Sequence, residues 1–424
     1  MTVLVACAVI LFCMALSVPI AVSIGLGSVY YFLASGKPLM MIPQKMFTTV
    51  DNFTLLAVPL FILAGNIMNT GGITKRLFNF ARTCVGHITG GLGHVCVLAS
   101  IIFAGMSGSA TADAVGLGSI EIPAMEKEGY DKEFSSAIVL GASTIGPIIP
   151  PSIIMVIYAV VAGVSVGALF VAGIIPGLVM GGGLMVGVYI ISKKRRYPSY
   201  PRATVRQLLT ATRDAFPVLL TPIIIIGGIY SGFFTPTEAA MIAVVYAVIL
   251  GFFYREMTWR ALWQILRETS VTVGVIMFII GITGGFAWWL SLEKIPQLFT
   301  TYIYSVTQDR IVILLLINLI ILVEGCFLDA TPIVLIMVPI LMPLLKVLEV
   351  DMVYFGILIA VNTMIGLTTP PVGVCLYGVS AIAKLPIEKI VQAYIPFLTI
   401  LVAVLLLLTL FPQLSLFLPN LLFK

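Results

Sequence analysis

Long apolar stretches run through almost the whole sequence and limit the fold more strongly than any other feature. A helix needs about 20 mostly apolar residues to cross the hydrocarbon core of a bilayer. Within lipid, only helices and closed barrels satisfy their backbone hydrogen bonds. We therefore predict an all-α, polytopic membrane protein with candidate spans at residues 2–34, 54–69, 134–168, 169–192, 215–234, 238–255, 270–292, 353–384 and 391–420.

Composition excludes the main soluble alternatives. Of the 424 residues, 60% are hydrophobic and only 10% are charged, whereas soluble domains carry about 25% charged residues. So few charges could not cover a water-exposed surface, which excludes a soluble enzyme, a nucleic-acid-binding protein and a disordered protein. The six cysteines form no CxxC pair and are expected to be small packing residues. The sequence starts without a charged segment, so no cleaved signal peptide is expected.

Two other apolar stretches, 91–126 and 310–346, are interrupted near their middle by small and polar residues. The interruptions are Gly105–Asp113 and Glu324–Pro332. Each half is too short for a full span, and non-helical backbone at membrane depth survives only inside protein or beside a watery cavity. Each stretch therefore predicts a re-entrant hairpin with its tip near the midplane.

The two hairpins belong to an internal repeat. A shift of 220 residues, without gaps, aligns residues 105–176 with 325–396 at 13 identities in 72 positions. Glycines and prolines, which set backbone geometry, recur in register. The recurring residues include Gly105, Ala110, Thr111, Pro123, Gly146, Pro150, Pro151 and Pro176, which align with Gly325, Ala330, Thr331, Pro343, Gly366, Pro370, Pro371 and Pro396.

The distribution of lysine and arginine predicts the orientation. Residues 193–213 hold seven of the 23 cations and should be cytoplasmic, because cytoplasmic loops carry an excess of these residues. Assigning successive loops to alternate sides of the membrane, starting from this segment, places 17 lysines and arginines on the cytoplasmic side and six on the opposite side. The two copies are then inverted, and inverted repeats with interrupted segments are typical of secondary transporters. The stretch 2–34, with Pro19, is either one kinked helix or two short helices, so the side of the N-terminus stays open.

Prolines break the apolar stretches next to both hairpins. A proline has no N–H, so the carbonyl four residues earlier loses its helical donor. The carbonyls concerned belong to Gly146 and Pro147 in the first copy, and to Gly366 and Leu367 in the second. With the hydroxyls and carboxylate of the tips they could form an oxygen shell for Na⁺, the tip residues being Ser107, Ser109, Thr111, Asp329 and Thr331. The alternative is a pair of proline kinks without ligands.

Acidic residues at membrane depth are functional candidates by default. Asp329 is the strongest, because it replaces Ser109 of the first copy, and Asp113 could orient the first tip. Glu238 fits a helix N-cap better, whereas Glu121 and Glu324 could be structural. The two histidines, His87 and His94, and the dispersed cysteines form no transition-metal site.

Two other classes of function remain as alternatives. Residues Gly105–Gly108 form a G-x-S-G string, which could position the nucleophile of an intramembrane serine protease. That mechanism needs a base, and no histidine follows His94. A passive channel would not need two inverted sites on broken helices. We therefore expect a transporter without catalytic residues, and not an enzyme.

The tip and break sequences resemble those of a known family. The runs Phe103–Asp113, Ile120–Met125, Gly146–Ser152 and Gly366–Gly373 are similar to the large membrane subunit (M subunit, DctM type) of tripartite ATP-independent periplasmic (TRAP) transporters. The resemblance covers nearly the whole chain and implies an elevator-type carrier of the ion-transporter superfamily. The expected transport domain comprises residues 91–168 and 309–384. The expected scaffold comprises 1–90, 169–308 with a cytoplasmic linker at 193–213, and a C-terminal helix within 385–424.

The resemblance also implies ligand sets. The first Na⁺ site would use Ser107, Ser109, Gly146, Ile149 and Pro151. The second would use Gly325, Asp329, Gly366 and Thr368 or Thr369. Substrate would lie near Ala110, Thr111, Thr144, Ala330, Thr331 and Asn362. Because this set has no lysine or arginine, an anion would rely on hydroxyls, backbone N–H groups, helix N-termini and bound Na⁺.

The resemblance finally implies partners and a location. We expect Na⁺ as coupling ion, a small four-helix TRAP membrane subunit as a separate chain, and a periplasmic substrate-binding protein. The protein would lie in the bacterial inner membrane and carry an organic acid, whether a C4-dicarboxylate, sialic acid or another sugar or keto acid. The alternative within the superfamily is a Na⁺/dicarboxylate symporter that works alone.

Overall fold

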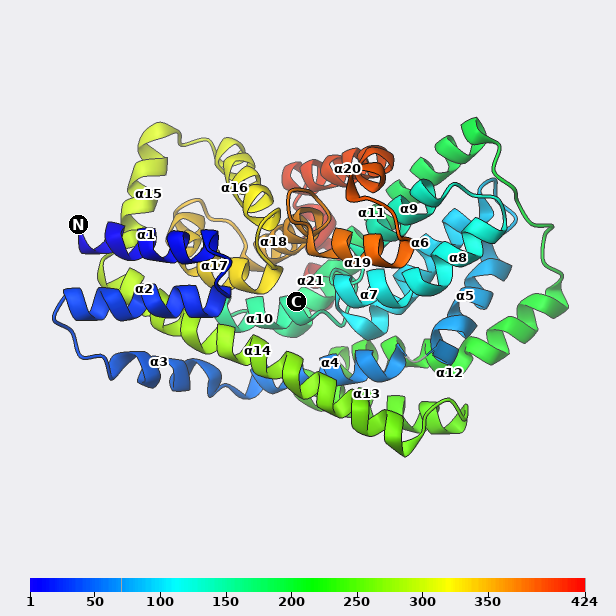
Figure 1. The fold of residues 1–424 in the computed structure, drawn as a ribbon, viewed down its shortest axis with the longest axis horizontal. Helices are drawn as coiled ribbons and strands as arrows, with labels where there is room; N and C mark the ends of the chain where they lie inside the picture. Colours follow the sequence, from blue (N-terminus) through cyan, green and yellow to red (C-terminus); the bar gives the residue numbers. More distant parts are fainter. Residues whose placement is uncertain (70, 424) are drawn as a thin grey trace.

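The computed structural model describes residues 1–69 and 71–423, and within them it forms helices and no strand (Figure 1). Six helices are long and apolar enough to cross a membrane, or seven if a pair bent by 66° at residues 51–52 counts as one span. The chain is therefore a multi-pass membrane protein, and the predicted all-α class is confirmed.

The N-terminal part consists of short helices. The stretch 2–34 forms two of them. The first ends at Ala15, and Pro19, which has no backbone N–H to donate, is the N-cap residue of the second. These two helices pack side by side (Figure 1). The elements are α1 (Thr2–Ala15), α2 (Ile20–Ala34), α3 (Met41–Val50), the 3₁₀ turn η1 (Phe53–Leu56), α4 (Ala57–Met68) and α5 (Gly71–Val85).

Both predicted hairpins are present. The first has α6 (Gly91–Ser107) as one arm, and α7 (Ala110–Gly116) with α8 (Gly118–Lys127) as the other. The second consists of α16 (Arg310–Gly325) and α17 (Ala330–Val347). Each returning arm starts with a side-chain cap, since Ser109 accepts from the Ala112 N–H and Asp329 accepts from the Ala330 N–H.

Both predicted helix breaks are present as well. In the first copy, residues 144–152 separate α9 (Lys132–Ser143) from α10 (Ile153–Ala162). In the second, residues 368–373 separate α18 (Met352–Leu367) from α19 (Val374–Ala383). Each break contains a cis Pro–Pro peptide bond, at Pro150–Pro151 and Pro370–Pro371.

The two copies interlock. Helix α7 of the first hairpin packs on α19 of the second broken helix, and α17 of the second hairpin packs on α10 of the first. The second tip is also fixed to its own break, because the Cys326 carbonyl accepts from the Val372 N–H at 3.1 Å. There Gly325 and Gly366 touch, and a Cβ on Gly366 would lie 2.5 Å from the Gly325 Cα. The hairpins and broken helices therefore form one packed unit.

The remaining helices surround this unit. Several of them pack directly against it: α11 contacts α6, α9 and α18, α20 contacts α9 and α18, and α14 and α15 both contact α17. The stretch 391–420 is divided at Phe411–Pro412 into α20 and α21. The surrounding helices are α11 (Val166–Arg195), α12 (Val205–Tyr230), α13 (Pro236–Phe253), α14 (Trp259–Leu292), α15 (Ile295–Val306), α20 (Ile387–Leu410) and α21 (Gln413–Leu422). The expected linker 193–213 is mostly helical, because α12 already begins at Val205.

Cation-rich loops meet at one end of the molecule, near α5, α8 and α12 in Figure 1. Arg76 of α5 pairs with Glu256, between α13 and α14, at 2.6 Å. Arg195 at the end of α11 pairs with Asp131, before α9, at 2.5 Å. These ion pairs thus join four of the five loops expected in the cytoplasm, two by two, and the side of the membrane on which the loops lie stays a prediction.

Candidate functional site

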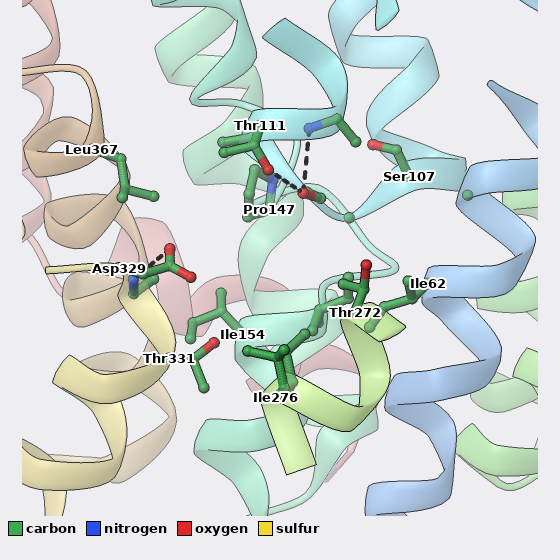
Figure 2. A pocket seen from close by; sticks show the side chains of 18 of the residues that line it. Ile62, Ser107, Thr111, Pro147, Ile154, Thr272, Ile276, Asp329, Thr331 and Leu367 are labelled. Atoms are coloured by element: carbon green, nitrogen blue, oxygen red, sulfur yellow. Dashed lines mark hydrogen bonds between the residues drawn. The ribbon is translucent and has the colours of Figure 1, made fainter. Parts of the chain in front are cut away.

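A cavity of about 620 Å³ lies between the two hairpin tips and helices α4 and α14 (Figure 2). The first hairpin and break contribute Ser107–Ala112, Pro147, Ile153 and Ile154, and the second copy contributes Asp329–Thr331, Met364 and Leu367. The opposite wall consists of Ile62, Gly65 and Asn66 of α4 and of Val271, Thr272, Val275, Ile276 and Ile279 of α14. The described lining thus has a mostly apolar wall facing polar tips, and it includes no lysine or arginine.

A buried carboxylate closes the back of the first tip. Asp113 is only 1% exposed, and its Oδ1 accepts a hydrogen bond from the Ser107 hydroxyl. Its other oxygen, Oδ2, is buried and has no hydrogen-bond partner among the residues that the structure describes. A Cβ built on Gly146 would lie 2.0 Å from this oxygen. The hairpin tip, the carboxylate and the helix break therefore meet at Gly146.

The first break also exposes backbone oxygens. The carbonyls of Gly146 and Pro147 accept no hydrogen bond from any residue that the structure describes. The Pro151 carbonyl lies against the tip, since a Cβ on Gly108 would be 2.5 Å from it, and only glycine readily adopts the φ of +61° found there. Ile149 is half-buried beside them. The residues expected at the first Na⁺ site are thus brought together around Ser107 and Gly146, with Ser109 on the cavity side of the tip.

The second tip is more fully hydrogen-bonded. The Gly366 carbonyl accepts from the Thr369 N–H at 2.9 Å. We expected this carbonyl to be left without a donor by Pro370, and the Thr369 N–H takes the place of the missing donor. The hydroxyls of Thr368 and Thr369 both donate to the Ile365 carbonyl, and Thr368 is also 2.7 Å from the Tyr394 hydroxyl. Asp329 faces the cavity (Figure 2) and accepts from the Ala330 N–H at 2.8 Å.

Four of the six residues expected near substrate line the cavity: Ala110, Thr111, Ala330 and Thr331. The other two lie elsewhere. Thr144 is fully buried, with its hydroxyl donating to the Gly141 carbonyl. Asn362 is also fully buried and donates to the Asn318 carbonyl at 2.8 Å.

The wall formed by α4 and α14 was not predicted. Asn66 of α4 donates to Thr269 of α14 at 2.9 Å, and Thr272 lies on the cavity side (Figure 2). A polar residue inside the apolar stretch 54–69 is a signal that could have drawn attention to Asn66. Nothing in the local sequence of Thr272 brings it next to the tips, because that depends on tertiary packing.

The other acidic candidates lie in different settings. Glu238 forms the predicted capping box with Thr235 at the start of α13. Glu121 is fully buried on α8, with the Cys96 thiol as a polar neighbour. One carboxylate oxygen of Glu324 is buried and has no hydrogen-bond partner within the described part of the chain.

The string Gly105–Gly108 lacks the surroundings of a protease nucleophile. The Ser107 hydroxyl donates to Asp113, and His94 lies near the other end of the same helix α6, about 20 Å away along the helix axis. A serine nucleophile needs a base within hydrogen-bond reach. The geometry of the described residues therefore does not support this alternative.

The sequence matches the family described as "Tripartite ATP-independent periplasmic transporter, DctM component" over residues 7–414. The chain belongs to this family. Its membership makes this DctM-family chain a transporter component, and the family predicted from the sequence is confirmed.

Named relatives of this DctM-family chain include large permease proteins for different compounds. It is 44% identical over 394 residues to the sialic acid TRAP transporter large permease protein SiaM of Vibrio cholerae, covering 92% of each chain. It is 42% identical over 400 residues to the C4-dicarboxylate TRAP transporter large permease protein DctM of Pseudomonas aeruginosa, covering 94% of each.

A solved transporter shares the fold at low sequence identity. The crystal structure of the Alcanivorax borkumensis YdaH transporter, described as having an unusual topology, matches with a TM-score of 0.67 over 87% of each chain. The two sequences are 14% identical, so this likeness concerns the fold alone.

Proposed function

We propose that this DctM-family chain is the membrane carrier of a Na⁺-coupled organic-acid uptake system. The observation that carries the proposal is the oxygen cluster behind the first tip. There Oδ1 of Asp113 accepts from the Ser107 hydroxyl. Its Oδ2 has no partner among the described residues and lies against Gly146, whose carbonyl accepts no hydrogen bond from them either. Buried polar atoms are almost always paired, so a buried carboxylate oxygen in an all-oxygen cluster fits a bound cation.

The chemistry of the cluster favours Na⁺. Carboxylate, hydroxyl and carbonyl oxygens suit hard cations, whereas soft metals prefer sulfur and imidazole ligands. A single carboxylate among neutral oxygens matches a monovalent ion better than a divalent one. Ser107, Gly146, Pro151 and Asp113 would contact the ion. We expected Asp113 only to orient the first tip, whereas in this proposal its carboxylate supplies the negative charge of the first Na⁺ site.

A second Na⁺ site at the other tip is supported by Asp329. Its carboxylate faces the cavity, and Gly325 and Gly366 meet directly behind it. The Thr368 and Thr369 hydroxyls already donate to Ile365, so they could serve only as oxygen acceptors toward a cation.

An organic anion would bind in the cavity without a cationic side chain. The N-termini of α10 and α17 face it through Ile153, Ile154, Ala330 and Thr331, and helix N-termini attract anions. The hydroxyls of Ser109 and Thr111 and the amide of Asn66 supply further hydrogen bonds. Relatives are named for sialic acid and for C4-dicarboxylates, so both classes are candidates for the cargo.

An elevator movement of the packed unit fits this architecture. The contacts of α7 with α19 and of α17 with α10 join both hairpins and both breaks. Such a unit would carry the bound ions and substrate together past the wall formed by α4 and α14. The apolar side chains of that wall would permit sliding without breaking many hydrogen bonds.

The family description, a component of a tripartite periplasmic transporter, supports further partners. We expect a small membrane subunit as a separate chain and a periplasmic binding protein that delivers the acid, with this chain in the bacterial inner membrane.

Reconstitution tests this proposal. The chain would be placed in proteoliposomes with its small membrane subunit, and uptake of labelled N-acetylneuraminate and succinate would be measured with and without the periplasmic binding protein of the system. We expect uptake of one acid only with its binding protein present. Strong uptake of the free acid without that protein would favour a symporter that works alone.

A further inference from the structure

The cavity face of α14 continues toward the cation-rich end of the molecule. Val271, Thr272 and Val275 line the cavity. At 3.6 residues per turn, Arg267 and Glu268 lie on the same face one turn earlier. A second hollow, also of about 620 Å³, follows this face and shares Val271 and Thr272 with the cavity. The two hollows therefore adjoin along a single helix.

The second hollow is bordered by a polar stripe, which we call the α14 stripe: Arg260, Trp263, Gln264, Arg267 and Glu268. Its side chains face outward, because Leu262 and Ile265 on the opposite side pack against an apolar cluster with α13. Gln264 donates to Glu268 at 2.8 Å. Neither arginine forms an ion pair with a residue in the described part of the chain.

We propose that the α14 stripe is an anion-binding vestibule through which the transported anion leaves the cavity on the cytoplasmic side, with Arg267 and Arg260 as its binding groups. The proposal rests on the proposed function, in which the cargo is an organic anion. Along the helix, Arg267 lies about 7.5 Å from Thr272 and Arg260 about 18 Å. Guanidinium groups bind carboxylates with two parallel hydrogen bonds, so an anion released from the tips meets one arginine and then the other.

Two observations favour a water-filled vestibule over a lipid-covered surface. The stripe carries three charged side chains and one amide, those of Arg260, Gln264, Arg267 and Glu268, and such groups are costly to place against lipid tails. The stripe also continues the face of α14 that lines the cavity, because both hollows include Val271 and Thr272. Trp259, 76% exposed at the first residue of the helix, fits the membrane interface and marks the outer limit of the vestibule.

Charge-selective cysteine labelling tests the proposal without knowledge of the substrate. Thr272→Cys would be placed in the otherwise native chain, in inside-out membrane vesicles. Rates of reaction with an anionic and a cationic methanethiosulfonate would be followed by mass spectrometry of the peptide that contains residue 272. The measured quantity is the ratio of the anionic rate to the cationic rate.

We expect the ratio to fall about threefold to tenfold when Arg260→Gln and Arg267→Gln are combined, because nearby positive charges concentrate anions locally. Glu268→Gln should raise the ratio. Arg206→Gln, which removes a charge on α12, is the matched control and should leave the ratio unchanged.

Two results would overturn the proposal. One is a ratio that the double arginine variant does not change. The other is protection of residue 272 from both reagents, which would show that lipid or a partner helix covers the stripe. Neither result depends on whether the acid, its binding protein or Na⁺ coupling has been identified correctly.

Discussion

A single methyl group at Gly146 should disable the first ion site. In Gly146→Ala the new Cβ would lie 2.0 Å from Asp113 Oδ2 and 2.9 Å from Asp113 Cγ. Carbon and oxygen atoms without a bond between them need more than 3 Å, so the carboxylate must move by more than about 1 Å. That movement takes the charged ligand away from the position where Ser107 and the break hold it.

The size of the effect follows from the lost contact. A hydrogen-bond-like contact to a charged group contributes about 1.5–3 kcal/mol, which corresponds to a tenfold to hundredfold weaker affinity for Na⁺. Crowding a packed interior with an extra methyl group also costs about 1–3 kcal/mol of folding stability. The variant should therefore be both less stable without Na⁺ and less responsive to Na⁺.

Thermal unfolding in detergent separates these two effects. Ligand binding stabilises the folded state by RT ln(1 + [L]/Kd). At a Na⁺ concentration of 100 Kd the wild type would gain about 2.7 kcal/mol, and a hundredfold loss of affinity reduces this to about 0.4 kcal/mol. Unfolding temperatures would be recorded over a Na⁺ titration, with choline keeping the ionic strength constant.

Gly182→Ala is the matched control. It makes the same change in helix α11, where a Cβ would meet no atom within 4 Å, so it should keep the full response to Na⁺. If Gly146→Ala responds to Na⁺ at the same concentrations as the wild type and Gly182→Ala, the assignment of Asp113 and Gly146 to an ion site is refuted.

Three further predictions follow from the second tip and from the orientation. Asp329→Asn keeps an amide oxygen to cap α17 but removes the charge, so uptake should need about tenfold more Na⁺ at unchanged expression; an unchanged Na⁺ dependence would remove Asp329 from the ion site. Gly366→Ala places a Cβ 2.5 Å from the Gly325 backbone and should sharply lower the yield of folded protein, whereas Gly274→Ala, with no atom within 4 Å, should not; equal yields would contradict the close crossing. Cysteines at Ser199 and Gln308 should react with an impermeant maleimide from opposite sides of the membrane, and labelling from the same side would reject the inverted arrangement.

The hairpins and the broken helices could be predicted from sequence because they depend on residues that act locally. Paired prolines such as Pro150 and Pro151 end a helix wherever they occur. The internal repeat, with its shift of 220 residues, then indicated that the same interruption occurs in both halves of the chain. Pro19 was ambiguous for the same reason, since a proline can either kink a helix or begin a new one.

The detailed site could be predicted only in part, because it depends on how side chains rotate and on distant packing. Thr144 is the first residue of one break and Asn362 lies shortly before the other, but their side chains bond to Gly141 and Asn318. The Thr368 hydroxyl meets Tyr394 of α20, which no local pattern indicates. The wall formed by α4 and α14 comes from elements remote in sequence from either tip.

The most direct test of the central claim is uptake driven by an imposed ion gradient. Proteoliposomes with the complete system would be loaded with K⁺ and diluted into Na⁺ at equal pH, or diluted into acidic Na⁺-free buffer. The account predicts that the acid accumulates above its external concentration only under the Na⁺ gradient, with a Hill coefficient for Na⁺ above one. Accumulation driven by the pH gradient without Na⁺ would contradict it.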